Sequence, residues 1–337
     1  MARRRFGTRR FRNRNRRHAL AWDSLTHMQI KTIAIAGLGT MGPGIAARCA
    51  RAGLAVSVYD VASEARDRAP QGVAVARGIL DSLGIAPPTW GEGAVTVCDS
   101  LEAAVRRADL VIENVPEAIE TKAAFYRSLD PLIATETVVA SDTSGIPITK
   151  LQAFLSNPAR LAGMHWSNPP AIIPLIEVIA GEHTAPAVTQ TLVELIRFMK
   201  LLPVVVKKDV PGFVENRVLY ALLREAVDLV ENGVVDPDDL DTCVSWGIGY
   251  KLSVVGPMAL LDMAGLDIYR SVASFLNAEL CDRKDVPSFI TERTDAGKLG
   301  IKSGEGLYTY TPERAKSLAA ERARRLVAVR KVLEAGS

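Results

Sequence analysis

Short apolar runs rich in β-branched residues alternate with amphipathic stretches through the first half of the chain. We interpret these runs as buried strands at 30–36, 55–59, 95–97, 110–113 and 138–140. The stretch after the first run has helical spacing and ends at Gly53, where a helix C-cap is expected. Strands that alternate with helices in this way predict an α/β fold with a doubly wound parallel sheet.

The pattern becomes helical after residue 208 and stays so to the end. Pro211 suits the first position of a helix whose apolar residues recur every four positions, and Gly233 closes that helix. We expect further helices over 237–244, 257–280 and 314–335, the last on the surface. Strongly apolar helices in so small a part usually pack against a second copy, which predicts a homodimer.

Charge is distributed unevenly along the 337 residues. The formal charge is +3, from 41 Lys and Arg against 38 Asp and Glu. Residues 1–27 hold nine arginines and one acid, so they contribute 9 − 1 = +8, and the other 310 residues carry −5. We expect residues 1–27 to be a disordered extension and Met28 to be the natural start. A nucleic-acid-binding arm and a mitochondrial-type presequence are the alternatives.

The remaining composition is that of an ordinary globular protein, with 48% apolar and 23% charged residues. No apolar run reaches the roughly 18–20 residues that a membrane span needs. The four cysteines form no CxxC pair, so we expect reduced, mostly buried thiols in a cytoplasmic protein, with neither a zinc site nor disulfides. The predicted domains are 28–208 and 209–337, with no nucleic-acid or membrane partner.

A glycine-rich turn follows the first strand and opens the first helix. Gly37 permits the tight turn, Gly39 lets the backbone approach a diphosphate, and Gly42 allows close packing of helix on strand. The N-terminus of the helix then binds the diphosphate. The turn therefore predicts a Rossmann-type dinucleotide site, and its predicted contacts are Gly37, Leu38, Gly39, Thr40, Met41 and Gly42.

An acid at the end of the second strand indicates which dinucleotide is bound. Asp60 lies 23 residues after Gly37, where its carboxylate can accept the ribose hydroxyls of the adenosine. The same carboxylate would repel a 2′-phosphate, and Val61 rather than an arginine follows it. We therefore expect NAD, not NADP, as the cofactor.

A histidine and an acid are the strongest candidates for chemistry. His165 lies near the end of the strand-like run 160–166, and Glu177 lies within the apolar run 172–179. An acid buried in an apolar strand needs a partner, and a carboxylate raises the basicity of an imidazole that is to act as a general base. From spacing alone, a structural His–Glu pair and no contact at all remain alternatives.

At this point the sequence resembles the 3-hydroxyacyl-CoA dehydrogenase family over 29–310. The blocks that carry the resemblance are GLGTMGPGIA, VIENVPEAIETK, ASDTSGIPITKL, GMHWSNP with IPLIEV, DVPGFVENRVL and LGIKSGEGLYTY. They occur in family order and at family spacing. The resemblance implies an NAD-dependent dehydrogenase with a Rossmann-type domain and a helical C-terminal domain.

The resemblance also implies roles for individual residues. His165 is the general base and Glu177 orients it. Ser144 and Asn216 bind the reacting oxygen or position the substrate. The implied cofactor contacts beyond the glycine turn are Glu117, Lys122 and Lys302.

Three departures from the family pattern bear on the substrate. No lysine occurs between Asp60 and Pro88, where members that bind CoA carry a lysine-rich hairpin. The usual NTSS is DTSG at 142–145, and the usual HFFNP is HWSNP at 165–169. These departures point to the branch that acts on small free acids, similar to carnitine and gulonate dehydrogenases.

Within that branch, GLGTMGPG, SDTSGIPITKLQ, GMHWSNPP and DTCVSWGIGYKL are similar to an enzyme of vitamin B6 degradation that oxidises a carboxylated pyridine aldehyde. An aldehyde hydrate is a diol that alcohol-oxidising residues can oxidise to the acid, without the nucleophilic cysteine of other aldehyde dehydrogenases. Arg217 and Lys251 are candidates for binding the substrate carboxylate. A hydroxyacyl-CoA dehydrogenase, a carnitine- or gulonate-type dehydrogenase and a non-catalytic dinucleotide sensor are the alternatives.

Overall fold

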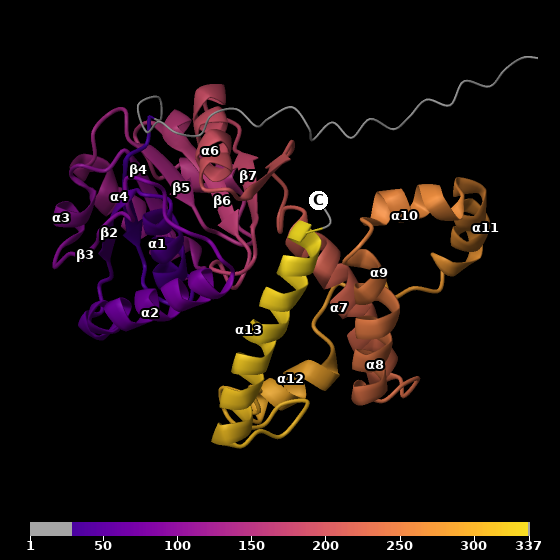
Figure 1. Ribbon diagram of the computed structural model, residues 1–337. Helices are drawn as coiled ribbons and strands as arrows, with labels where there is room; N and C mark the ends of the chain where they lie inside the picture. The colour runs from indigo at the N-terminus through magenta and orange to yellow at the C-terminus, as the bar shows by residue number, and fades with distance from the viewer. Residues whose placement is uncertain (1–28, 336–337) are drawn as a thin grey trace, which may run out of the picture.

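The computed structural model describes residues 29–335, in which a sheet-containing part precedes a helical part (Figure 1). The expectations for residues 1–27 and for Met28 lie outside the described residues. The observed order is the one that the sequence predicts: an α/β unit comes first and helices follow it.

One mixed sheet of eight strands forms the first part, in the order β3-β2-β1-β4-β5-β6-β7-β8. All neighbours are parallel except β6 and β7, which are antiparallel. The strands are β1 (Thr32–Ala36), β2 (Ala55–Tyr59), β3 (Val95–Val97), β4 (Leu110–Glu113), β5 (Val138–Ser141), β6 (Leu161–Trp166), β7 (Leu175–Ala180) and β8 (Leu202–Val206).

Helices cover both faces of this sheet, as the alternating pattern predicted. Apolar residues of α1, α2 and α6 pack in one buried cluster, and those of α3, α4 and α5 pack in a second. The bounds are α1 (Gly42–Arg51), α2 (Ser63–Ser82), α3 (Leu101–Val105), α4 (Ile119–Leu129), α5 (Ile148–Gln152) and α6 (Pro186–Phe198), with 3₁₀ turns at Asp130–Leu132 and Pro158–Arg160. The doubly wound fold is confirmed.

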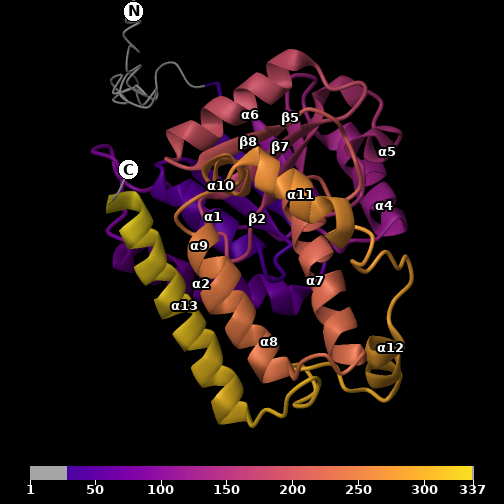
Figure 2. The ribbon, with the colours of Figure 1, turned by 90° about the vertical axis from the view of Figure 1, so that its right-hand side faces the viewer.

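The helical part has almost no buried interior of its own. Among the described residues after Val214, only Arg330 is buried. Helices α10 and α11 project away from the sheet, whereas α13 runs back beside it (Figures 1 and 2). The elements are α7 (Glu215–Glu231), α8 (Pro237–Cys243), a π-helical turn (Val244–Gly249), α9 (Tyr250–Leu252), α10 (Pro257–Ala264), α11 (Leu266–Leu276), α12 (Ser288–Asp295) and α13 (Pro312–Ala335).

Three expectations were wrong, two about the helices of this part and one about the cysteines of both parts. The first helix starts at Glu215 rather than Pro211, because Phe213 has a left-handed backbone with φ of 49°. The helix expected over 257–280 is broken at Gly265, whose φ is 103°. The thiols are free, but they are not mostly buried: Cys49 is buried and Cys243 is exposed.

Within the described residues, no single helix combines the length and apolarity of a membrane span. One pair, Pro237–Leu252 with Pro257–Ala264, meets that test only when its two pieces are joined across an 85° bend.

Candidate active site

The glycines between β1 and α1 differ in the space around them. A Cβ on Gly37 would lie 2.1 Å from the carbonyl oxygen of Asn114, and one on Gly42 would lie 2.3 Å from that of Gly37. A Cβ on Gly39 would meet nothing within 4 Å. The turn is thus packed tightly behind Gly37 and Gly42 and is open in front of Gly39, as a diphosphate cradle requires.

A pocket of about 900 Å³ opens on this side of the turn. It is lined by the turn, by Asp60 at the end of β2 and by Asn114 after β4. The two carboxylate oxygens of Asp60 accept the N–H groups of Leu38 at 2.7 Å and Ala62 at 2.9 Å. These bonds hold the carboxylate at the pocket edge and leave lone pairs for ribose hydroxyls, so the residues present fit a bound dinucleotide.

His165 and Glu177 face each other across the antiparallel pair of strands. Their backbones are directly opposed in the β6–β7 register, and His165 Nδ1 lies 2.9 Å from Glu177 Oε2. The carboxylate can only accept, so Nδ1 carries the hydrogen and Nε2 is left free to take a proton. Both side chains are buried, at 7% and 1% exposure. The expected pair is present.

The second carboxylate oxygen of Glu177 binds the start of the helical part. Oε1 accepts the N–H groups of Val214 at 2.9 Å and Glu215 at 3.2 Å, at the beginning of α7. Glu177 therefore orients the imidazole with one oxygen and caps a helix with the other.

These contacts set the protonation behaviour of the pair. Burial alone would lower the pKa of His165, but the hydrogen bond to Glu177 and the charge of Asp142 outweigh it and raise that pKa. Burial would raise the pKa of Glu177, but the bonds from His165 and from the α7 backbone lower it. The glutamate is ionised beside an imidazole made more basic, which is the arrangement of a general base.

The first turn of α7 also reaches the loop after β5. Asn216 donates from Nδ2 to the carbonyl oxygen of Ser144 at 2.8 Å. Glu117 Oε1 accepts the N–H groups of Ser144 and Gly145, both at 2.9 Å, and the Thr143 hydroxyl at 2.6 Å. The structure thus joins Ser144, Asn216 and Glu117 to the His165–Glu177 pair through one network.

Lys122 is placed behind this loop and is not a surface lysine. It is 1% exposed, and its Nζ lies 2.6 Å from Glu113 and 3.3 Å from Glu117. The Tyr126 and Ser141 hydroxyls bind the other oxygen of Glu113. Lys122 therefore supports Glu117, and its contact with a cofactor stays a prediction.

A second pocket of about 820 Å³ lies beside Ser144 and Asn216. Its wall carries more cations than acids, because Arg217, Arg224, Arg283 and Lys284 line it together with Glu117 and Asp285. Lys251 is not among its lining residues. Lys302 is exposed, lies in the segment between α12 and α13, and lines neither of these two pockets. Its predicted role in cofactor binding stays a prediction.

The sequence interpretation missed three acids of this region. Asp142 accepts the N–H of Trp166 at 2.7 Å, and burial raises its pKa to about 8 against the opposing effects of that bond and of His165. Glu215 accepts from the Ser167 hydroxyl, and one ligand atom each of His165, Glu177 and Glu215 lie within 4.8 Å of one another. Hydrogen bonds already occupy the carboxylates of Glu177 and Glu215. Glu113 carried a usable signal, because it is a lone acid ending an apolar strand.

Comparisons with known proteins bear on this site. Residues 32–210 match the family model described as 3-hydroxyacyl-CoA dehydrogenase, NAD binding domain, and residues 212–310 match the C-terminal domain of the same family. The chain is 68% identical, over 90% of its length and 99% of the relative, to 5-formyl-3-hydroxy-2-methylpyridine 4-carboxylate 5-dehydrogenase from Mesorhizobium japonicum. It is 36% identical, over 84% of its length and 98% of the relative, to a probable 3-hydroxybutyryl-CoA dehydrogenase from Bacillus subtilis.

A solved structure also matches the chain along most of its length. A crystal structure of 5-formyl-3-hydroxy-2-methylpyridine 4-carboxylic acid 5-dehydrogenase, described as an NAD+ dependent dismutase, matches with a TM-score of 0.89 at 68% identity. The match covers 90% of this chain and 99% of that one.

Proposed function

The chain belongs to the 3-hydroxyacyl-CoA dehydrogenase family of NAD-dependent oxidoreductases, and from that premise we propose that it oxidises a carboxylated pyridine aldehyde to the acid. The substrate proposed is 5-formyl-3-hydroxy-2-methylpyridine-4-carboxylate, and the product is the 4,5-dicarboxylate. The observation that carries this proposal is the network that joins His165 and Glu177 to Ser144 and Asn216 at the edge of a basic pocket.

Residues of the first pocket would hold the cofactor. The backbone at Gly39 offers open space for the diphosphate, and Asp60 offers a carboxylate for the adenosine ribose. When bound, NAD supplies a hydride acceptor at C4 of its nicotinamide, and its reduced form supplies a hydride donor.

The protein's own contribution is to bind the aldehyde hydrate and to move one proton. Nε2 of His165 takes the proton of one diol hydroxyl as the hydride leaves the same carbon, so that this C–O bond becomes the C=O of the acid and the other hydroxyl stays in place. Glu177 stabilises the imidazolium that forms. Ser144 and Asn216 hold the diol oxygens, and orientation of this kind contributes much of the rate.

The same residues can also serve the reduction of an aldehyde to an alcohol. An imidazolium at His165 can return its proton to a second aldehyde as that aldehyde becomes an alcohol. We therefore propose that one aldehyde is reduced for each one oxidised when NADH stays bound, in line with the description of the related structure as a dismutase.

The pocket wall supports a carboxylate substrate rather than a CoA thioester. Arg217 follows Asn216 directly and lines the pocket, so we propose it as the partner of the substrate carboxylate. Helix α2 contains none of the lysines that CoA-binding members of the family carry in this interval, and its cations are Arg66, Arg68 and Arg77. Hydroxyacyl-CoA oxidation remains the second candidate because relatives with that activity match most of the chain.

One parallel assay tests these proposals. NADH absorbance and product ratios are followed with the pyridine aldehyde, acetoacetyl-CoA, carnitine and gulonate. We expect the aldehyde to be consumed fastest, with acid and alcohol formed together. Faster turnover of acetoacetyl-CoA would overturn the substrate proposed. Tight NAD binding without turnover of any of the four would indicate a sensor.

We also propose that the protein is a cytoplasmic homodimer that has a small-molecule substrate and binds neither nucleic acid nor membrane. The apolar residues left exposed along α10 and α11 support a second copy as the partner. Their burial between two copies would supply the core that the helical part of one chain lacks.

A further inference from the structure

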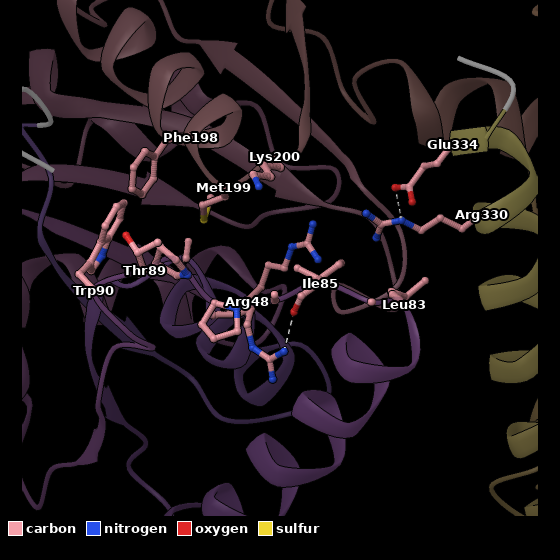
Figure 3. A pocket seen from close by; sticks show the side chains of 16 residues that line it. Arg48, Leu83, Ile85, Thr89, Trp90, Phe198, Met199, Lys200, Arg330 and Glu334 are labelled. Carbon is pink, nitrogen blue, oxygen red and sulfur yellow. Dashed lines mark hydrogen bonds and ion pairs between the residues drawn. The ribbon is translucent and has the colours of Figure 1, made fainter. Parts of the chain in front are cut away.

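A third pocket, of about 540 Å³, lies away from the two pockets of the active site and shares no lining residue with either. It is enclosed by the end of α1, the loop after α2, the turn before β8 and the end of α13 (Figure 3). Four of its lining residues are basic, namely Arg48, Arg51, Lys200 and Arg330.

Arg48 is the unusual member of this group. It is 2% exposed, and none of its three guanidinium nitrogens has a hydrogen-bond partner among the described residues. Figure 3 shows its side chain reaching into the pocket between the walls that carry Lys200 and Arg330. Burial and the neighbouring charge of Arg330 lower the pKa of Arg48 to about 10, against the raising effect of the Glu334 carboxylate. A buried guanidinium without a hydrogen-bond partner is among the most costly groups that a folded chain can contain.

The other buried cations of the pocket are already paired. Arg51 binds Asp81 at 2.7 Å and Glu92 at 3.0 Å. Arg330 binds Glu334 at 2.8 Å and donates to the carbonyl oxygen of Ile172. Positive charge at Arg48 and Lys200 therefore exceeds the negative charge that faces the pocket.

The rest of the wall is apolar and partly aromatic. The rings of Trp90 and Phe198 are stacked, with centroids 6.5 Å apart and planes 20° apart, and Leu83, Ile85 and Met199 also line the pocket. Such a wall suits a ligand with an apolar body, whereas inorganic phosphate would leave it uncovered.

We propose that this pocket is a binding site for a small organic carboxylate. Its oxygens would accept hydrogen bonds from the guanidinium of Arg48, and its apolar body would lie against Trp90 and Phe198. A planar carboxylate matches the two donors of a guanidinium edge. Because Arg48 belongs to α1 and Arg330 to α13, a ligand here would bind the sheet-containing part and the last helix together.

Thermal unfolding of the full chain tests the site, with benzoate as the probe, sodium chloride at matched ionic strength as the blank and phosphate as a second anion. Benzoate at about ten times its Kd should raise Tm by roughly 2–4 °C. Arg48→Met should raise Tm without benzoate, because it removes an unpaired buried charge, and should abolish the benzoate response.

Arg160→Met is the matched control. Arg160 is also buried, but it is paired with Asp130 at 2.8 Å. Its replacement should lower Tm and leave the benzoate response intact. Lys200→Gln, at an exposed position, should weaken benzoate binding several-fold even if Arg48→Met does not fold.

Three results would overturn the proposal. They are no benzoate response in the wild-type chain, an undiminished response in Arg48→Met or Lys200→Gln, and a response to phosphate alone. None of them depends on turnover, so they are independent of the proposed function.

Discussion

Single side chains set the protonation state on which the proposed reaction depends. Sequence spacing was enough to nominate His165 and Glu177, because a buried acid near a histidine is costly unless the two meet. It could not predict their contact, since twelve residues of chain allow many separations. The β6–β7 register supplies that contact by placing the two residues opposite each other.

Replacing His165 should remove the proton acceptor. We expect His165→Ala to lower kcat by about 10²–10⁴-fold without changing the Kd for NADH, measured by fluorescence titration. His183→Ala, at the exposed histidine of the sheet-containing part, is the control and should behave as wild type. A near-normal rate in His165→Ala would remove this residue from the proposed mechanism.

Glu177→Gln should change the pH dependence as well as the rate. Aldehyde oxidation needs the neutral imidazole, so it falls as pH drops through the pKa of His165, which Glu177 helps to raise. Without the carboxylate charge that pKa falls, and the acid limb of the kcat/KM profile moves to lower pH while the plateau decreases. An acid limb at the wild-type position would contradict this assignment.

Asp60 should set the choice between the two dinucleotides. We expect Asp60→Asn to raise the Kd for NADH by roughly 10–100-fold, because charge-assisted bonds to the ribose become neutral ones. The same change should reduce discrimination against NADPH, since the repelling charge is gone. Equal loss of affinity for both dinucleotides would point to damage of the pocket instead.

At the scale of elements, the turn between β1 and α1 separates a structural glycine from a binding one. Gly39→Ala adds a methyl group where nothing lies within 4 Å, so the protein should stay folded with weaker NADH binding. Gly42→Ala places a methyl group 2.3 Å from the Gly37 carbonyl oxygen and should lower Tm. Thermal melts and NADH titration of the two variants provide the comparison. Equal melting temperatures would contradict this distinction.

Sequence patterns located most strands but not all elements. The runs at 55–59, 95–97 and 110–113 match β2, β3 and β4. Strand β8 was missed because the sequence LPVVV contains Pro203 and lies at the sheet edge, where its side chains are mostly exposed. The reversed direction of β7 also escaped prediction, since an apolar run does not encode strand direction.

At the scale of the whole molecule, the helical part leaves large apolar side chains exposed. Phe275 is 61% exposed and Met263 is 74% exposed. Helical periodicity predicted these stripes but not what covers them, because the pattern of one chain does not specify a partner surface.

The proposed dimer makes a direct prediction about mass. Light scattering after gel filtration should give twice the chain mass for the wild type, and Phe275→Asp should shift the protein toward the monomer. Val75→Asp, at an equally exposed valine on α2, should leave the mass unchanged. A monomeric wild-type protein would overturn the proposed dimer.

The two hydrogen-bonding roles of Glu177 make the site depend on the folding of α7 onto the sheet. Its Oε1 is satisfied only when the backbone of Val214 and Glu215 has reached the sheet. A nascent or truncated chain that lacks α7 would lose those donors, which help to keep Glu177 ionised beside His165, and would also lack Asn216, although its dinucleotide pocket is built from residues up to Leu132 alone. Such a chain would bind cofactor but would not turn over substrate. The protein would therefore become active only after its second half has folded onto the first.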